Sequence, residues 1–133
     1  MRRLVVGVDV TPVERIAAAM GRHPRFAEKI FTETERRRAR SRPERFATRW
    51  AAKEAVLQAL GIGARRGIAW RDVEIRNEPA GRPVVVIRGG VRDLAERLGV
   101  ARVFVSISHC RTHATAYAVA VVKDGDGVEK PES

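Results

Sequence analysis

Disulfide bonds within one chain are excluded, because the 133 residues include a single cysteine, Cys110. One thiol on its own fits a reducing compartment. Long hydrophobic runs are absent as well, since none approaches the roughly 20 residues that a membrane-spanning helix needs. The first apolar stretch reaches Asp9 too soon for a secretory signal peptide. We therefore expect a cytoplasmic protein that does not enter a membrane.

Aromatic residues are scarce too, with four Phe, two Trp and one Tyr, so there are few rings on which single-stranded nucleic acid can stack. Positive charge is abundant: 26 Lys and Arg against 16 Asp and Glu give a net charge of +10. Such a charge predicts an anionic partner, which is nucleic acid, a phosphorylated small molecule or an acidic protein. No nucleic-acid-binding motif is legible in the sequence.

The segment 43–63 has the most regular pattern of the chain and predicts a long amphipathic helix. Pro43 stands where helices accept proline, in the first turn, and Gly61 stands where helices end. Between them an apolar stripe recurs at helical spacing, formed by Phe46, Trp50, Leu57 and Leu60. Two charges interrupt the pattern, since Lys53 falls within the stripe and Glu54 on its shoulder. Lys53 either serves a site or extends its ammonium past the stripe to water.

The remaining segments alternate between strand and helix patterns. We expect strands at 4–10, 72–76, 83–88, 103–109 and 114–122, and helices at 13–26, 26–41 and 89–100. The strand at 4–10 is expected to be buried on both faces, because nearly every position is apolar. This order is typical of an α+β domain in which a small, largely antiparallel sheet packs with the long central helix. We place one domain at 1–122 and a disordered tail at 123–133.

Two carboxylates, those of Asp9 and Glu54, come from different elements at the edges of buried regions. Asp9 is expected at the end of its strand, where a buried acid needs a helix N-terminus, a cation or a metal as a partner. Part of this segment has another explanation, since Thr11 can cap the next helix with Pro12 in the first turn. Magnesium prefers one or two carboxylates completed by water and phosphate, whereas zinc prefers His or Cys. The pair therefore has the composition of a magnesium site.

His109 ends a predicted strand beside Cys110. Neighbouring side chains on a strand point to opposite faces, so a Cys–His nucleophile pair is disfavoured. With Ser108 beside it, His109 fits hydrogen bonding to a phosphate, and a surface histidine at a turn explains it as well. Glycines and arginines in the loop at 61–67 suit phosphate binding through backbone N–H groups. The arginine run at 36–42 is expected to be solvated and mobile.

Three segments together resemble the holo-acyl-carrier-protein synthase branch of the 4′-phosphopantetheinyl transferases. The first is Gly7-Val8-Asp9 followed by Arg15-Ile16, and the second runs from Arg49 through Lys53 and Glu54 to Gly61. The third is Ser106-Ile107-Ser108-His109 followed by Ala114, Ala116 and Val119. The segments occur in the family's order with similar gaps, over roughly residues 4–122.

The resemblance implies a magnesium-dependent transfer of 4′-phosphopantetheine from coenzyme A to a serine of an acidic apo-acyl carrier protein, with release of adenosine 3′,5′-bisphosphate. By position, Asp9 and Glu54 match the family's metal ligands, and they are expected to act in catalysis with Lys53 and Gln58. The match also implies coenzyme A contacts at Arg49, Lys53, Gly61, Gly63, Ser108 and His109, and carrier-protein contacts at Arg15, Arg22 and Arg25. The family usually forms trimers with active sites shared between subunits.

One position departs from the family's pattern. Four residues after Glu54, where a lysine is common, this chain has Gln58. Glutamine carries no charge and is no base near neutral pH, so removal of the serine proton is expected to fall to Glu54 or to a water on the metal. Two alternatives stay open. One is a basic module that binds nucleic acid through its arginine run without catalysis, and the other is a transferase-like protein that binds coenzyme A with impaired turnover because of Gln58.

Overall fold

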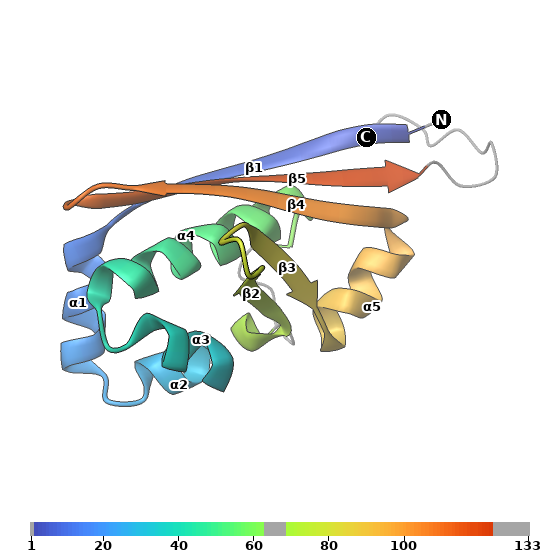
Figure 1. Cartoon of the computed structure of the whole chain (residues 1–133). Coiled ribbons are helices and arrows are strands. Elements are labelled where there is room, and N and C mark those ends of the chain that lie inside the picture. The colour runs from blue at the N-terminus through green and yellow to red at the C-terminus, as the bar shows by residue number, and fades with distance from the viewer. Residues whose placement is uncertain (1, 63–68, 124–133) are drawn as a thin grey trace.

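In the computed structural model, which describes residues 2–62 and 69–123, a three-stranded antiparallel sheet forms one layer and helices lie beneath it (Figure 1). The strands are β1 (Arg2–Pro12), β4 (Val100–His109) and β5 (His113–Lys123), in the order β1-β5-β4. In the central strand, Ala118 pairs with Gly7 on one side and with Val105 on the other. The predicted α+β class is confirmed.

Helix α4 (Pro43–Ala59) packs along β1 and β5 on the inner face of this sheet. As predicted, Pro43 lies in its first turn, and Gly61 follows its end with a φ of 72° that glycine adopts without strain. Helix and sheet approach closely because both present small buried side chains, Ala47, Ala51, Ala55 and Ala59 on α4 and Ala114, Ala116, Ala118 and Ala120 on β5. The backbone of β1 lies against the helix at Gly7, where a Cβ would lie 2.0 Å from the carbonyl oxygen of Ala55.

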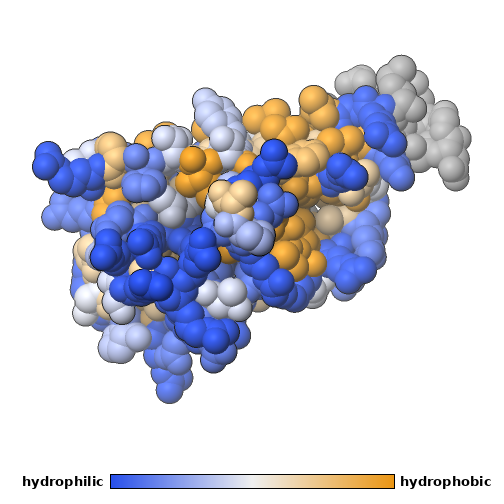
Figure 2. All heavy atoms as spheres, viewed as in Figure 1, coloured by the Kyte–Doolittle hydropathy of each residue, from blue (hydrophilic) through white to orange (hydrophobic). Residues whose placement is uncertain are grey.

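The expectation that the first strand is buried on both faces is wrong. Gly7 and Thr11 are buried against the interior, but the alternate side chains are exposed. They form, with one residue each of β4 and β5, a surface that we call the outer apolar face: Leu4, Val6, Val8, Val10, Phe104 and Tyr117. Figure 2 shows apolar side chains along the sheet layer right of centre and below it toward β3, whereas the surface of the helices at lower left is mostly hydrophilic. An apolar run can therefore mark a strand with one face in the core and one at the surface.

Three short helices follow β1. They are α1 (Val13–Arg22), α2 (Phe26–Ile30) and α3 (Glu33–Ala39). The single helix predicted at 26–41 is two helices, because Thr32 starts a new one with a capping box: Glu35 N–H donates to Thr32 Oγ1 and Thr32 N–H donates to the Glu35 carboxylate. The helix predicted from Val13 onward likewise ends at Arg22 and does not continue to Phe26.

The predicted hairpin and the helix after it form a smaller unit beneath β4 (Figure 1). Its elements are the 3-10 helix η1 (Trp70–Asp72), β2 (Val73–Asn77), β3 (Pro83–Ile87) and α5 (Gly89–Arg97). Asp72 joins η1 to α5, since its carboxylate accepts a hydrogen bond from Gly90 N–H at 3.1 Å. This contact fixes the start of α5 against the hairpin.

The predicted tail is described only at Lys123, which is the last residue of β5. The other tail residues, 124–133, lie outside the described part of the chain. Among the described residues, no helix has the length and apolar character needed to cross a membrane.

Candidate active site

Asp9 and Glu54 come together where β1 crosses α4. Gly7 brings the strand's backbone against the helix at Ala55. Asp9 lies two residues further on, on the same face of the strand, and Glu54 directly precedes Ala55. Both carboxylates are half-buried. The two acids that the sequence singled out therefore share one site, although β1 runs on to Pro12 and Asp9 does not stand at its end.

Asp9 is held in place by threonines. Thr11 Oγ1 donates a hydrogen bond to Asp9 Oδ2, and Thr115 Oγ1 donates to the Asp9 carbonyl oxygen at 3.0 Å. The alternative that Thr11 caps the next helix is wrong, because the N-cap residue is Pro12 and it receives no side-chain cap. Thr11 is buried beside Asp9, so it orients the carboxylate.

The charges around Glu54 favour a cation. Burial raises the pKa of Glu54 above its usual range and the Asp9 carboxylate raises it further, while Arg15 acts in the opposite direction. Two carboxylates this close repel each other unless a cation or a proton lies between them. Within the described residues, no group of three or more His, Cys, Asp and Glu side chains could hold a metal. The pair fits Mg²⁺, which accepts two carboxylates and takes its other ligands from water and phosphate.

Gln58 follows Glu54 by one helical turn and contacts β1. Its Oε1 accepts a hydrogen bond from Val8 N–H at 2.8 Å. Since Val8 directly precedes Asp9, this bond ties the strand that carries Asp9 to the helix that carries Glu54. A lysine side chain has no acceptor. Gln58 therefore has a structural contact in this chain that a lysine at the same position cannot make.

Replacing Gln58 with leucine or lysine is expected to speed hydrogen exchange of the Val8 amide about fivefold, because a net hydrogen-bond free energy of about 1 kcal/mol is lost. Amide exchange followed by NMR measures this directly. Gln58→Glu is the matched control, since glutamate keeps an acceptor oxygen. Equal exchange rates in the unchanged protein and all three variants would mean that the bond does not hold the strand.

A strongly basic cavity lies at the N-terminal half of α4. It measures about 800 Å³ and is lined by Thr34, Arg37, Arg38, Arg40, Arg45, Thr48, Arg49, Asn77 and His109. Arg49 precedes Glu54 by five residues, which corresponds to about 7.5 Å along the helix axis. The structure thus brings together Arg49 and His109, two residues for which coenzyme A contacts are predicted.

The cavity changes the interpretation of the arginine run at 36–42. The first three arginines of the run lie in helix α3, and Arg36 donates a hydrogen bond to the Phe31 carbonyl oxygen at 2.9 Å. Three of the nine residues that line the cavity belong to the run: Arg37, Arg38 and Arg40. The run is therefore mostly exposed, as expected, but its first half is helical and part of it lines a cavity.

Arg49 is the buried cation of this cavity, with 7% of the residue exposed. Its Nη1 donates to the Arg45 carbonyl oxygen at 3.1 Å and its Nη2 to Asn77 Oδ1 at 3.3 Å. Among the described residues its buried Nε has no hydrogen-bond partner. Burial lowers the pKa of Arg49, Glu35 opposes this, and Arg38 and Arg45 lower the pKa further. An anionic ligand would relieve this repulsion between cations.

Other predicted contacts lie elsewhere. Ser108 and His109 are neighbours on β4, so they point to opposite faces, Ser108 toward the side of the outer apolar face. Gly61 is exposed just beyond α4, and Gly63 lies outside the described residues. Lys53 is fully buried 2.8 Å from Glu35 Oε1, so the alternative that its ammonium extends to water is wrong. Burial lowers the pKa of Lys53, and Glu35 opposes the shift.

The three predicted carrier-protein contacts are exposed but do not share one helix. Arg15 and Arg22 are seven residues apart in α1 and so lie on one face. Arg25 comes after the end of α1, directly before α2. Arg15 also lowers the pKa of Glu54, which places it at the candidate active site as well as on the basic surface.

Comparison with known proteins accounts for this arrangement. A family profile described as "ACPS: 4'-phosphopantetheinyl transferase superfamily" matches residues 5–122. The chain belongs to this superfamily. Holo-[acyl-carrier-protein] synthase of Moorella thermoacetica is 46% identical over 123 residues, which are 90% of this chain and 94% of that protein. The same enzyme of Koribacter versatilis is 41% identical over 120 residues, covering 87% and 96%.

A solved structure of this superfamily has the same fold. The Chronobacterium ammoniagenes ACPS-CoA complex superposes with a TM-score of 0.82 at 30% identity, over 92% of this chain and 99% of that one.

Within this 4′-phosphopantetheinyl transferase, sequence reasoning missed Arg38, Arg45 and Asn77 as cavity residues. Arg45 could have been predicted from the sequence, since it precedes Arg49 by one turn of the predicted helix. Asn77 comes from the hairpin, and nothing in the sequence indicates that it reaches α4.

Proposed function

We propose that this protein transfers 4′-phosphopantetheine from coenzyme A to a serine of an apo-acyl carrier protein, with Mg²⁺ held by Asp9 and Glu54. The relatives named holo-[acyl-carrier-protein] synthase support this activity. The observation that carries it is the crossing of β1 and α4, which holds two repelling carboxylates together near a cavity of arginines. A phosphate-rich cosubstrate suits both features.

In this reaction the serine oxygen forms a bond to the phosphorus that carries the pantetheine. The bond from that phosphorus to the bridging oxygen breaks, and adenosine 3′,5′-bisphosphate leaves with the electron pair. The metal, when bound, neutralises charge on the pyrophosphate. The serine proton needs an acceptor, and we assign this role to the Glu54 carboxylate, which is a base located at the proposed metal site. Gln58 cannot accept the proton near neutral pH, and its side chain positions β1 through Val8.

The direct test combines the protein, coenzyme A, Mg²⁺ and an apo-carrier protein, and follows the carrier by mass spectrometry. We expect the carrier to gain one phosphopantetheine group in a reaction that chelation of the metal stops. Binding of coenzyme A without any gain in carrier mass, tested with carriers of fatty-acid and polyketide type, would favour the alternative of impaired turnover. Tight binding to duplex DNA with a steep salt dependence and no transfer would favour the nucleic-acid-binding module.

The basic cavity is assigned to phosphate groups of coenzyme A, the 3′-phosphate in particular. That group carries more negative charge than a phosphodiester, and the cavity combines the buried Arg49 with His109 and several arginines. Arg49 lies about 7.5 Å from Glu54 along α4. One ligand can therefore place its pyrophosphate near Asp9 and Glu54 and a further phosphate among the arginines.

Replacing Arg38 with glutamine is expected to raise the KM for coenzyme A about tenfold, because a charge-assisted contact to phosphate is lost. The KM for 3′-dephospho-coenzyme A should change little. Arg38 is exposed, so folding is spared, and Arg92→Gln on α5 is the matched control. Steady-state kinetics with both substrates checks the assignment. An equal rise in the two KM values would show that the cavity does not bind the 3′-phosphate.

Charge reversal at Arg22 and Arg25 is expected to raise the carrier-protein KM at low salt and to flatten its salt dependence, since exposed charges mainly steer association. The KM for coenzyme A should stay the same. Arg15 is left unchanged in this variant because it acts on Glu54. Kinetics at several salt concentrations measures the effect, with reversal of Arg97 on α5 as the control. A rise in the coenzyme A KM would assign this segment to the cosubstrate.

We further propose a homotrimer that associates through the outer apolar face. This face is formed by side chains from all three strands of the sheet, and a monomer seldom exposes such a continuous apolar surface. Ser108 lies on this side of β4, so its predicted contact with coenzyme A fits a site completed by a neighbouring subunit. Native mass spectrometry measures the oligomeric state, and a monomer at micromolar concentration would contradict the proposal. The cytoplasmic location stays a prediction.

A further inference from the structure

The interior of the protein holds a charged cluster around Lys53 that the proposed reaction does not use directly. Lys53 Nζ lies 2.8 Å from Glu35 Oε1 and donates to the carbonyl oxygens of Trp70, at 3.2 Å, and of Val73. An ammonium has three N–H donors, so these acceptors use all of them. The ring of Phe31 lies 5.6 Å from Nζ and adds a cation–π contact. In this arrangement Lys53 has no donor to offer to a phosphate.

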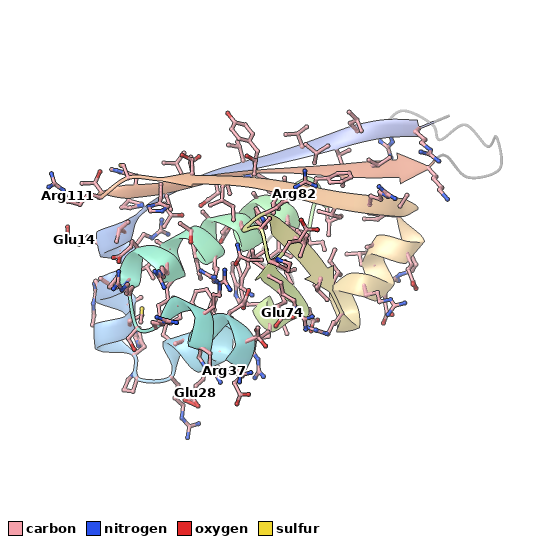
Figure 3. The ribbon with its side chains drawn as sticks, viewed as in Figure 1. Glu14, Glu28, Arg37, Glu74, Arg82 and Arg111 are labelled. Atoms are coloured by element: carbon pink, nitrogen blue, oxygen red, sulfur yellow. The ribbon has the colours of Figure 1, made fainter. Side chains whose placement is uncertain are left out.

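Glu35 is held as firmly as its partner. It is fully buried, its Oε1 accepts from Thr32 N–H at 2.9 Å, and its Oε2 accepts from Ile75 N–H at 2.7 Å. Thr32 Oγ1 donates onward to the buried Glu74 at 2.6 Å. Figure 3 shows Glu74 among the inner elements, whereas Glu28 lies at the outer surface. The ion pair therefore joins the start of α3 and strand β2 to helix α4.

This anchoring determines which way α4 presents its next residue. Lys53 and Glu54 are consecutive, so their side chains point about 100° apart around the helix. Since Lys53 is fixed toward α3 and β2, Glu54 is turned toward β1 and Asp9. We propose that Lys53 is a positioning residue, which through its buried ion pair with Glu35 sets the rotation of α4 and presents Glu54 to the metal, and that it does not contact coenzyme A. The identity of metal and substrate rests on the proposed function.

The cost of the alternative supports this assignment. To reach a phosphate, the Lys53 ammonium must leave Glu35, and the carboxylate would then be buried without a cation. Breaking a buried pair in this way is strongly unfavourable. The phosphates also have other cations at hand, because Arg38, Arg45 and Arg49 line the basic cavity.

Three variants test the proposal: Glu35→Gln, Lys53→Met and the two together. Each single variant leaves one charge buried without its partner, so we expect the Tm to fall by more than about 10 °C. The double variant removes both charges at similar side-chain volume and is expected to regain at least half of that loss. The exposed pair Arg92 and Glu96, 3.4 Å apart on α5, provides the matched control. Arg92→Met, Glu96→Gln and their combination should shift the Tm by no more than about 2 °C.

Positioning predicts an effect beyond stability. At a temperature at which every variant is folded, Mn²⁺ binding is titrated through the electron paramagnetic resonance signal of the free ion. The Mn²⁺ affinity should fall about tenfold or more in the single variants, as for other residues that orient metal ligands. In the double variant we expect both the Mn²⁺ affinity and the coenzyme A KM within about threefold of the unchanged protein.

Two results would overturn the proposal. A double variant with restored Tm and a coenzyme A KM raised about tenfold or more would show that Lys53 contacts coenzyme A. An unchanged Mn²⁺ affinity in the folded single variants would show that the ion pair stabilises the protein without positioning Glu54. Failure of the proposed function is distinguishable, because it would appear as absence of transfer by the unchanged protein. The comparison of Tm and Mn²⁺ affinity among the variants would still decide the role of Lys53.

Discussion

Glu54→Gln and Asp9→Asn are each expected to lower the kcat of transfer by about a thousandfold or more. The amide oxygen of either replacement is a poor ligand for Mg²⁺ compared with a carboxylate. In Glu54→Gln the expected acceptor of the serine proton is lost as well. Folding should be preserved or improved, because burial and the neighbouring carboxylate already disfavour the charge of Glu54. Transfer to the carrier protein and thermal unfolding measure the two effects.

The matched control for this pair is Glu96→Gln, an exposed carboxylate on α5, which should leave kcat unchanged. Mn²⁺ titration of the folded variants gives a second readout, and both Asp9→Asn and Glu54→Gln should bind the ion much more weakly. Turnover within about tenfold of the unchanged protein in either variant would remove that residue from the metal site.

Gly7→Ala is expected to destabilise the protein by about 3 kcal/mol or more. The added Cβ would lie 2.0 Å from the Ala55 carbonyl oxygen and 2.7 Å from the Ala59 backbone nitrogen. Backbone atoms cannot turn aside as a side chain can, so β1 must move away from α4. Asp9 would move with the strand, and we expect any folded fraction to require more Mg²⁺ for turnover. Thermal and urea unfolding measure the stability change.

Gly21→Ala is the control for the glycine substitution. Gly21 lies in α1, and a Cβ there meets nothing within 4 Å. Alanine in a helix is favoured over glycine by about 0.5–1 kcal/mol, so this variant should be slightly more stable. Comparable stability of the two alanine variants would mean that β1 and α4 are less tightly packed than the structure shows.

The sequence predicted the elements with strong local signals. Pro43 and Gly61 bounded α4 correctly, because both act through their own backbone conformation. The break at Thr32 was also readable, since Thr32 and Glu35 have the spacing of a capping box. The residues on both sides of Thr32 have a helical pattern, however, and this pattern led to the prediction of a single helix at 26–41.

Contacts between residues far apart in the sequence could in general not be predicted. Asp9 and Glu54 stood out in the sequence as acids beside apolar segments, and the structure brings them close together, while their role as metal ligands stays a prediction. No pattern shows that Glu35 is buried beneath α4 or that Lys53 points toward it, since the two meet only after α3 and β2 fold onto that helix. A lysine in an apolar stripe can extend its ammonium to water, contact a ligand or form a buried ion pair, and the position of its counter-ion decides which of these occurs.

The central strand β5 turns small side chains inward, whereas the outer apolar face of the sheet is formed by large ones. Ala114, Ala116, Ala118 and Ala120 face the helix, while Leu4, Phe104 and Tyr117 are exposed on the other side. A single copy therefore gains little hydrophobic free energy from the bulkier half of its sheet. If copies associate through this surface, the folded state is favoured by mass action, and its Tm rises with total protein concentration. Each copy then acts as a stabilising ligand for the others, and dilution alone is enough to weaken the fold.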